Sequence, residues 1–345
     1  MKILAVDIGT GTQDIMFYDS NQNIENSIKL VLPSPTRIIG NKIRNSKNDI
    51  LITGETMGGG PVNRAIMEKI QKGHEIVMTE NAARTIRDDL DRVKAYGIEI
   101  ISENKLKVNE DQYSGFDKIV FKDVDLVAIE KALKEFNVKL EFDFLGVAVQ
   151  DHGYMEGMGD RNFRFMKIKE KLDIPLKPEQ FSYFKTAPDY FTRMKAVSRL
   201  FNKYNLMLMD SKFASICGAT CDDTVKSLDK FVVMDVGNGH TLAAAFDGEK
   251  IVGVFEHHTR SLNKEKIELY VKKLVKGTLT HDEIHSDNGH GAWVLEELED
   301  IECIVATGPK RKLLNQTGYN IYHAAPAGDV MMTGPVGLIK AINTI

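Results

Sequence analysis

Hydrophobic residues at the start of the chain fall into three short runs separated by polar, turn-forming segments. The runs are "KILAVDIG", "QDIMFYD" and "NIENSIKLVLP", with segments such as "DSNQN" between them. Short apolar runs bounded by Gly, Asp, Asn and Ser are typical of strands joined by tight turns. The pattern therefore predicts that the chain begins with a β-meander.

Near residue 50 the pattern changes to short strands followed by amphipathic helices. "ILIT" precedes the glycine-rich "GETMGGG", after which Pro61 opens a segment with apolar residues at helical spacing. "HEIVMTENAARTIRDDLDRVKAYGIEIIS" repeats this plan, with Asn81 as the expected helix cap. Farther on, "LVAIEKALKEFN" predicts a helix, "FDFLGVAVQDHG" a buried strand that ends in a loop, and 161–203 two or three helices. The chain therefore has an α/β pattern.

A second meander begins near residue 229 and resembles the first. In "FVVMDVGNGHTLAAAFD", as in "ILAVDIGTGTQDIMFYD", an apolar strand leads to an Asp-x-Gly turn and an outgoing strand. Two such segments more than 200 residues apart indicate two lobes of related topology rather than a short-period repeat. We expect an N-terminal lobe at 1–204, with additions at about 40–140, and a C-terminal lobe at 205–345.

Composition and charge narrow the class of protein. The 345 residues are 43% hydrophobic and 27% charged with a net charge of −4, which gives no electrostatic reason to expect a nucleic-acid partner. No apolar run is long enough for a membrane helix or a signal-peptide core, which predicts a cytoplasmic protein with no membrane partner. We interpret the three cysteines as buried or inert thiols, because they are too few for a disulfide framework.

The two Asp-x-Gly turns carry residues suited to bind phosphate and Mg²⁺. Glycines that can adopt positive φ let backbone N–H groups close around a phosphate chain. Asp7 and Asp235, at the strand ends, can hold the water shell of Mg²⁺. We expect the two turns to face each other across a cleft. The predicted phosphate-binding residues are Gly9, Thr10, Gly11, Thr12 and Gln13 in the first turn and Gly237, Asn238, Gly239, His240 and Thr241 in the second.

These turns resemble the phosphate-1 and phosphate-2 motifs of the actin, Hsp70 and sugar-kinase superfamily of ATPases. Further along, "MDSKFASICGA" resembles its first connecting helix, "IECIVATGPKRKLL" its adenosine motif and "APAGDVMMTGPVGLIKAI" its second connecting helix. In the last segment Gly328, Gly334 and Gly337 would permit close helix contact. The resemblance implies a two-lobed actin-like ATPase (ribonuclease H-like) fold with duplicated mixed β-sheet lobes and a central nucleotide cleft.

The same resemblance implies ATP and Mg²⁺ as cofactors, with Thr307 and Gly308 at the adenosine. The chain departs from the superfamily pattern at Pro309, where a second glycine is usual, and at His240, where a small residue is common. Asp210 opens the first connecting helix as the candidate general base, and its alternative role is the N-cap of that helix.

Substrate contacts are expected at Gln150, Asp151 and His152. These residues follow a buried strand, the usual place for ligand contacts in open α/β sheets, and "VAVQDHGY" is similar to a segment near the sugar site of xylulose-type kinases. The favoured function is Mg-dependent phosphoryl transfer to a small-molecule substrate, or ATP hydrolysis. The alternatives are an ATP-driven activator of a protein client and a non-catalytic binding protein, and a homodimer is left open.

Three other segments have open interpretations. "GETMGGGPVNRAI", with Arg64, is either an additional anion site or a plain loop. "EHHTRS", with His257, His258 and Arg260, either points into the cleft or forms a surface turn. "THDEIHSDNGHGAW" is either a metal or substrate site or a polar loop over the cleft; its candidates are His281, Asp282, Glu283, His285, Asp287 and His290.

The whole chain also resembles a mainly archaeal family labelled "putative pyruvate formate-lyase activating enzyme". Genuine activating enzymes of that name hold an iron–sulfur cluster on a C-x3-C-x2-C triad. Here Cys217-x3-Cys221 is followed by "DDT", with no third cysteine two residues on. The residues therefore argue against a radical SAM enzyme.

Overall fold

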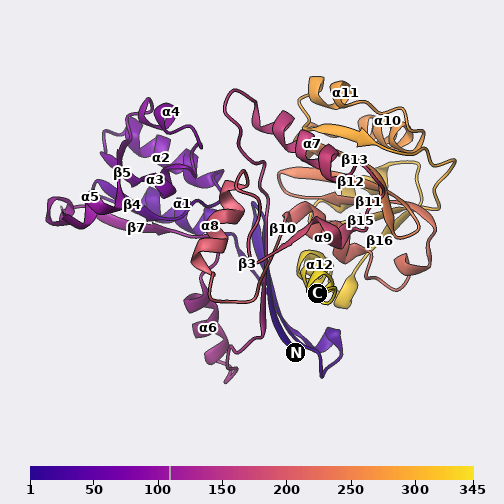
Figure 1. Ribbon diagram of the computed structural model, residues 1–345, viewed down its shortest axis with the longest axis horizontal. Coiled ribbons are helices and arrows are strands. Elements are labelled where there is room, and N and C mark those ends of the chain that lie inside the picture. The colour runs from indigo at the N-terminus through magenta and orange to yellow at the C-terminus, as the bar shows by residue number, and fades with distance from the viewer. Residues whose placement is uncertain (109) are drawn as a thin grey trace.

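The computed structural model describes residues 1–108 and 110–345. In these residues the strands form three sheets, with the orders β3-β2-β1-β8-β10-β9, β14-β13-β12-β11-β15-β16 and β6-β5-β4-β7. Figure 1 shows the second sheet at the right, the first near the middle and the third at the left.

The first sheet begins with the predicted meander. Its strands are β1 (Lys2–Ile8), β2 (Thr12–Asp19), β3 (Ile28–Pro33), β8 (Phe144–Val149), β9 (Ser182–Phe184) and β10 (Leu206–Met209). β1, β2 and β3 pair antiparallel, whereas β8 pairs parallel with both β1 and β10. Because β10 belongs to this sheet, the first lobe extends past the predicted boundary at residue 204.

The second sheet repeats the order of five of these strands and has its sixth strand, β14, at the opposite edge from β9. It contains β11 (Lys230–Val236), β12 (His240–Asp247), β13 (Lys250–His258), β14 (Gly291–Val294), β15 (Ile304–Thr307) and β16 (Ile321–His323). β11, β12 and β13 form the antiparallel meander, and β15 pairs parallel with both β11 and β16. The repeat confirms the predicted fold class, a mixed α/β protein with two duplicated, ribonuclease H-like lobes.

The third sheet lies within the predicted additions and is parallel throughout. Its strands are β4 (Ile50–Gly54), β5 (Ile76–Thr79), β6 (Glu99–Ile101) and β7 (Asp117–Phe121), and its helices are α1 (Pro35–Asn45), α2 (Pro61–Gln71), α3 (Glu80–Ala83), α4 (Leu90–Lys94) and α5 (Glu103–Val108). Pro61 opens α2 as predicted. The helix predicted with Asn81 as its cap is instead split into α3, whose N-cap is Thr79, and α4, which Asp89 caps; Thr85 between them accepts a hydrogen bond from the Met57 N–H (3.0 Å).

Two helices cross between the duplicated sheets. α9 (Ser211–Ala219) packs against β11 and β12, and α12 (Thr333–Ile342) packs against β1, β8 and β10. A Cβ on Gly218 would overlap the Thr333 carbonyl oxygen, and one on Gly337 would overlap that of Ala214. The two backbones therefore touch, as predicted for Gly337. Gly328 does not take part, because it lies before α12 in an open turn at φ 74°.

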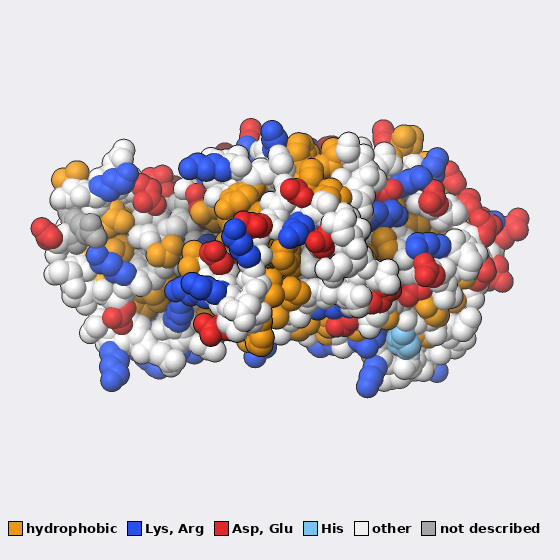
Figure 2. Space-filling model, turned by 90° about the horizontal axis from the view of Figure 1, so that it is seen from below, with side chains coloured by type: hydrophobic (Ala, Val, Ile, Leu, Met, Phe, Trp, Pro, Cys, Tyr) orange, Lys and Arg blue, Asp and Glu red, His pale blue; other side chains and the backbone are white. Residues whose placement is uncertain are grey.

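Both faces of the duplicated sheets are buried, which explains their continuous apolar runs. Along β1, Ile3 and Ala5 face the central core with α9 and α12, whereas Leu4 and Val6 face an outer core. The remaining helices are α6 (Leu126–Lys134), α7 (Asp160–Lys171), α8 (Thr192–Leu200), α10 (Lys264–Val275) and α11 (His281–Ser286). In Figure 2 apolar side chains gather near the middle of the visible face, with charges of both signs among them and toward its ends. None of the described helices has the length and apolar character needed to span a membrane.

Candidate functional site

A cavity of about 1250 Å³ lies between the two lobes. Its wall includes both Asp-x-Gly hairpins, the loop after β8, the glycine-rich loop before α2 and the first turn of α9. The predicted site residues that line it are Asp7, Gly9, Thr10, Thr12, Gln150, Asp151, His152, Asp235, Gly237, Asn238, Gly239, His240 and Gly308. The structure thus brings together residues from both ends of the chain.

The two hairpins have the same turn geometry and meet at their tips. The Gly9 N–H donates to the Thr12 carbonyl (2.9 Å), and at the equivalent position the Gly237 N–H donates to the His240 carbonyl (3.0 Å). A Cβ on Gly11 would overlap the Asn238 side chain, so the tips are in contact. The two glycine turns therefore face each other at one end of the cavity.

Several predicted residues lie behind the cavity wall instead. The Gln13 amide donates to the Pro33 carbonyl (3.0 Å), and the Thr241 hydroxyl bonds to that of Thr259 (3.0 Å). These two residues follow Thr12 and His240 along their strands, and successive side chains of a strand point to opposite faces. Thr307, predicted at the adenosine, is fully buried and its hydroxyl bonds to that of Thr333 on α12 (2.9 Å).

Buried carboxylates gather at the base of the cavity. Asp7 and Asp14 are directly opposite in the β1–β2 register, and the Oδ1 atom of each has no hydrogen-bond partner among the described residues. Burial raises the pKa of Asp7 to about 7. Burial, with the charge of Asp7, raises the pKa of Asp14 to about 8. Carboxylates with free oxygens in a buried cluster are suited to hold a cation.

Lys212 is buried beside these carboxylates. Its Nζ donates to Asp235 Oδ2 (2.7 Å), and a Cβ on Gly237 would overlap Nζ, so the lysine lies against the second turn. The sequence prediction included neither Lys212 nor Asp14. Strand alternation could have found Asp14, because it follows the cavity-lining Thr12 by two residues.

Asp210 is paired with an arginine rather than free to accept a proton from a substrate. It is the N-cap of α9 and accepts from the Lys212 N–H (3.0 Å). Arg164 of α7 donates to both of its carboxylate oxygens (2.8 and 3.1 Å) and, through Nε, to Glu256 of β13 (2.6 Å). All three charged side chains are buried, and Arg164 links the first lobe to the second.

The loop after β8 is held at both ends. Asp151 accepts from the N–H groups of Gly153 (2.9 Å), Arg193 (2.9 Å) and Met194 (3.0 Å), and burial raises its pKa to about 6. Gln150 donates to Glu256 (2.7 Å), and its Oε1 lies 2.8 Å from His240 Nδ1. The predicted substrate loop is therefore fixed by the fold, and its Asp151 carboxylate is already occupied.

The histidines of the other predicted segments separate in the fold. His281 and His285 stack on α11 (ring centroids 5.5 Å apart), and His257 is buried against Asp287 (3.1 Å). His258 and Arg260 line the cavity, as one reading of "EHHTRS" requires. His290 lies beside His152, with their Nε2 atoms 3.0 Å apart. His290 is one of the candidates predicted in "THDEIHSDNGHGAW", but nothing in the sequence indicates that His152 is its neighbour, because the two come from distant segments.

The cysteines are placed as the inert-thiol interpretation requires. Cys217 is buried on α9, its thiol donates to the Gly337 carbonyl (3.6 Å), and burial raises its pKa well above the usual range. Cys303 is also buried, and Cys221 is half-buried. Burial raises the pKa of both.

Several solved structures are similar to this chain. The inorganic polyphosphate/ATP-glucomannokinase from Arthrobacter sp. strain KM is 10% identical, with 100% of this chain and 99% of that chain covered and a TM-score of 0.37. The apo psk41 ParM protein is 14% identical, with 99% and 98% covered and a TM-score of 0.34. The ROK hexokinase from Thermus thermophilus is 9% identical, with a TM-score of 0.24. The matched region covers 73% of this chain and only 48% of the hexokinase. The fold assignment rests on the repeated strand order.

Sequence comparison identifies the family. No curated protein matches the chain. A family model described as "Putative pyruvate format-lyase activating enzyme (DUF1786)" matches residues 57–313, which is more than half of the 345 residues. The match includes the last part of the glycine-rich loop, the substrate loop, α9 and the second hairpin. The chain belongs to this family.

Proposed function

We propose that the chain binds Mg²⁺·ATP in the cavity between its lobes and transfers the γ-phosphoryl group to a small molecule or to water. The observation that carries this proposal is the pair of matching glycine turns that face each other beside buried carboxylates with free oxygens. Backbone N–H groups in such turns bind phosphate oxygens. The cavity, at about 1250 Å³, is large enough for a nucleotide and an acceptor together.

The residues at the base of the cavity fit Mg²⁺. Among the residues that the structure describes, one oxygen each of Asp7 and Asp14 has no hydrogen-bond partner, and Asp235 lies close enough to raise the pKa of Asp7. Mg²⁺ prefers oxygen ligands and keeps several waters, so Asp7 and Asp235 would hold it through its water shell. When bound, the ion neutralises charge on the phosphate oxygens.

Other charged residues have distinct roles in this proposal. Lys212 lies at the second turn and donates to Asp235. When a cation binds at Asp235 and this ion pair breaks, the lysine supplies a positive charge for the phosphates. Asp210 orients Arg164 and caps α9, so we assign it to positioning. Phosphoryl transfer needs mainly positioning and electrostatic stabilisation, which this set provides.

We infer that the acceptor is negatively charged. The added sheet contributes arginines to the cavity wall, among them Arg64 on α2 and Arg87, and Arg260 lies there from the second lobe. A carboxylate or phosphate group on the acceptor would pair with such side chains. Arg64→Ala should raise the KM for the acceptor while kcat changes little. Lys72 is exposed at the far end of α2, and the control Lys72→Ala should leave both KM and kcat unchanged.

Thermal unfolding with ATP tests the nucleotide site directly. Excess ATP at 100 times its Kd should stabilise the chain by about 2.7 kcal/mol with Mg²⁺ and less with EDTA. Gly239→Val should abolish the shift yet fold, because its Cβ would meet only the Thr10 hydroxyl, at 3.4 Å. Gly115→Val, at an open surface position, is the control and should respond as wild type does. No shift in wild type, or an equal shift in Gly239→Val, would contradict the proposal.

A further inference from the structure

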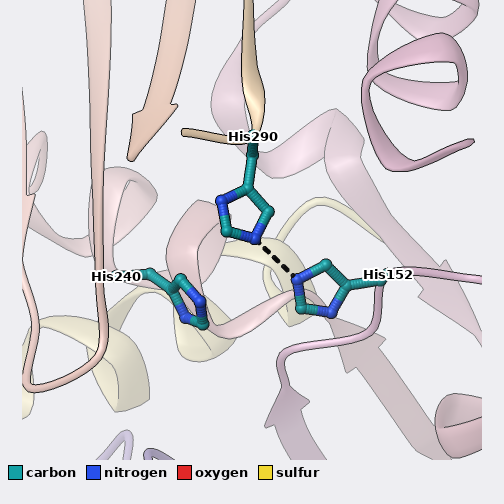
Figure 3. A group of neighbouring side chains, drawn as sticks. All are labelled: His152, His240 and His290. Atoms are coloured by element: carbon teal, nitrogen blue, oxygen red, sulfur yellow. Dashed lines mark hydrogen bonds between the residues drawn. The ribbon is translucent and has the colours of Figure 1, made fainter. Parts of the chain in front are cut away.

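Three histidines from separate segments point toward one another at the edge of the cavity (Figure 3). His152 follows β8 of the first lobe, whereas His240 begins β12 and His290 precedes β14 in the second lobe. Their ligand nitrogens all lie within 4.8 Å of one another. Imidazoles in this number are typical ligands of zinc and related transition metals.

A chain of hydrogen bonds fixes the protonation of His240. Glu256 is buried and accepts from Gln150 Nε2 (2.7 Å), which sets the orientation of the Gln150 amide. Gln150 Oε1 therefore faces His240 Nδ1 (2.8 Å). Because an amide oxygen only accepts, Nδ1 carries the hydrogen and Nε2 of His240 keeps its lone pair. A histidine held in this way by an outer partner is ready to bind a metal.

His152 and His290 have nearly the spacing that a shared metal needs. Their Nε2 atoms are 3.0 Å apart. Two nitrogens bound to one tetrahedral zinc ion, each at about 2.0–2.1 Å, would lie about 3.3 Å apart. His290 is 1% exposed, and its Nδ1 has no hydrogen-bond partner among the described residues. Nε2, beside that of His152, is therefore the nitrogen of His290 that a shared ion would bind.

The position of the three rings determines which side of a bound ion stays accessible. His152 and His240 line the cavity, whereas His290 is buried behind them. An ion among the three would therefore have its remaining coordination position on the cavity side. His240 directly follows Gly239, so this position is next to the second glycine turn.

We propose that His152, His240 and His290 bind one zinc-type divalent ion that joins the two lobes and offers an open coordination position to an oxygen atom of the substrate. This site is chemically distinct from the carboxylates around Asp7, because imidazole suits zinc and its neighbours whereas carboxylate oxygens suit Mg²⁺. The metal site does not depend on the ATP site, and each can be tested without the other.

Zinc titration of the full chain tests this site. After treatment with EDTA and dialysis, the wild type should bind one Zn²⁺ per chain in competition with a chelating indicator. Gln150→Leu removes an outer partner of His240 and should weaken Zn²⁺ binding by about 10–100-fold. His152→Ala removes a ligand and should weaken it by more than about 100-fold. The double variant His281→Ala/His285→Ala removes a different pair of stacked histidines and should bind Zn²⁺ as wild type does.

A cysteine variant separates loss of a ligand from loss of the fold. His152→Cys keeps a metal ligand, so Co²⁺ bound to it should show a thiolate-to-cobalt charge-transfer band that the wild type lacks. Circular dichroism of each metal-free variant should match that of the wild type. The proposal is overturned if the wild type binds no Zn²⁺, if His152→Ala binds it as tightly, or if the folded His152→Cys variant lacks the thiolate band.

Discussion

The substitution Asp7→Asn should stabilise the metal-free chain at pH 8 and remove its response to Mg²⁺. Asp7 is buried near the end of β1, with Asp14 opposite on β2, Asp235 on β11, Lys212 on α9 and Asp210 at the N-cap of α9. Burial, with a smaller contribution from the neighbouring aspartates, raises its pKa from 3.8 to about 7. A neutral amide has no such titration.

The pKa difference sets the size and the pH window of the effect. Between pH 3.8 and about 7 the folded chain holds a proton on Asp7 that the unfolded chain has lost. The free energy of unfolding therefore falls as the pH rises through this window and is flat above it. At about 1.4 kcal/mol per pKa unit, a difference of about 3 units gives about 4 kcal/mol. Since coupling to Asp14 reduces this, we expect Asp7→Asn to gain about 2–4 kcal/mol at pH 8 and close to nothing near pH 4.

Urea unfolding in EDTA, followed by circular dichroism at about pH 4.5 and pH 8, measures the effect. Asp247→Asn, at the exposed end of β12, is the matched control and should show no pH-dependent gain. Mg²⁺ added at pH 8 should stabilise the wild type but not Asp7→Asn. A variant that is less stable than the wild type by the same amount at both pH values would refute the reasoning, because Asp7 would then act only as a hydrogen-bonding group.

Two further substitutions test the packing between the lobes. Gly337→Val should cost about 3 kcal/mol or more because its side chain has no room where α9 and α12 touch, whereas Gly115→Val should stay within about 0.5 kcal/mol; thermal unfolding compares them. Arg164→Met should cost about 3–5 kcal/mol in urea unfolding, because it leaves Asp210 and Glu256 buried without their partner. A loss below about 1 kcal/mol would show that these carboxylates find other partners.

The duplicated hairpins could be predicted because their geometry is local. The turn bonds Gly9 to Thr12 and Gly237 to His240 span three residues each, so the spacing of Asp and Gly specifies them. The N-cap role of Asp210 is also local and is confirmed. Its pairing with Arg164, 46 residues away, depends on how α7 docks, and nothing in the sequence near either residue indicates it.

Long-range pairing explains what the sequence did not show. β10 joins the first sheet through parallel bonds to β8, so a boundary drawn from local pattern was placed too early. Thr241 and Thr307 were expected at the ligand because they lie in the motifs, yet Thr241 points to the opposite face of its strand, and Thr307 is buried beneath Thr333 of α12. His152, His240 and His290 come together only because both lobes and two loops fold around one point.

A crystal structure of the chain with Mg²⁺ and a non-hydrolysable ATP analogue tests the central claim most directly. We expect the β- and γ-phosphates between the turn at Gly9–Thr12 and the turn at Gly237–His240, with Mg²⁺ and its waters at Asp7 and Asp235. A nucleotide bound elsewhere, or phosphates that contact only one of the two turns, would contradict it.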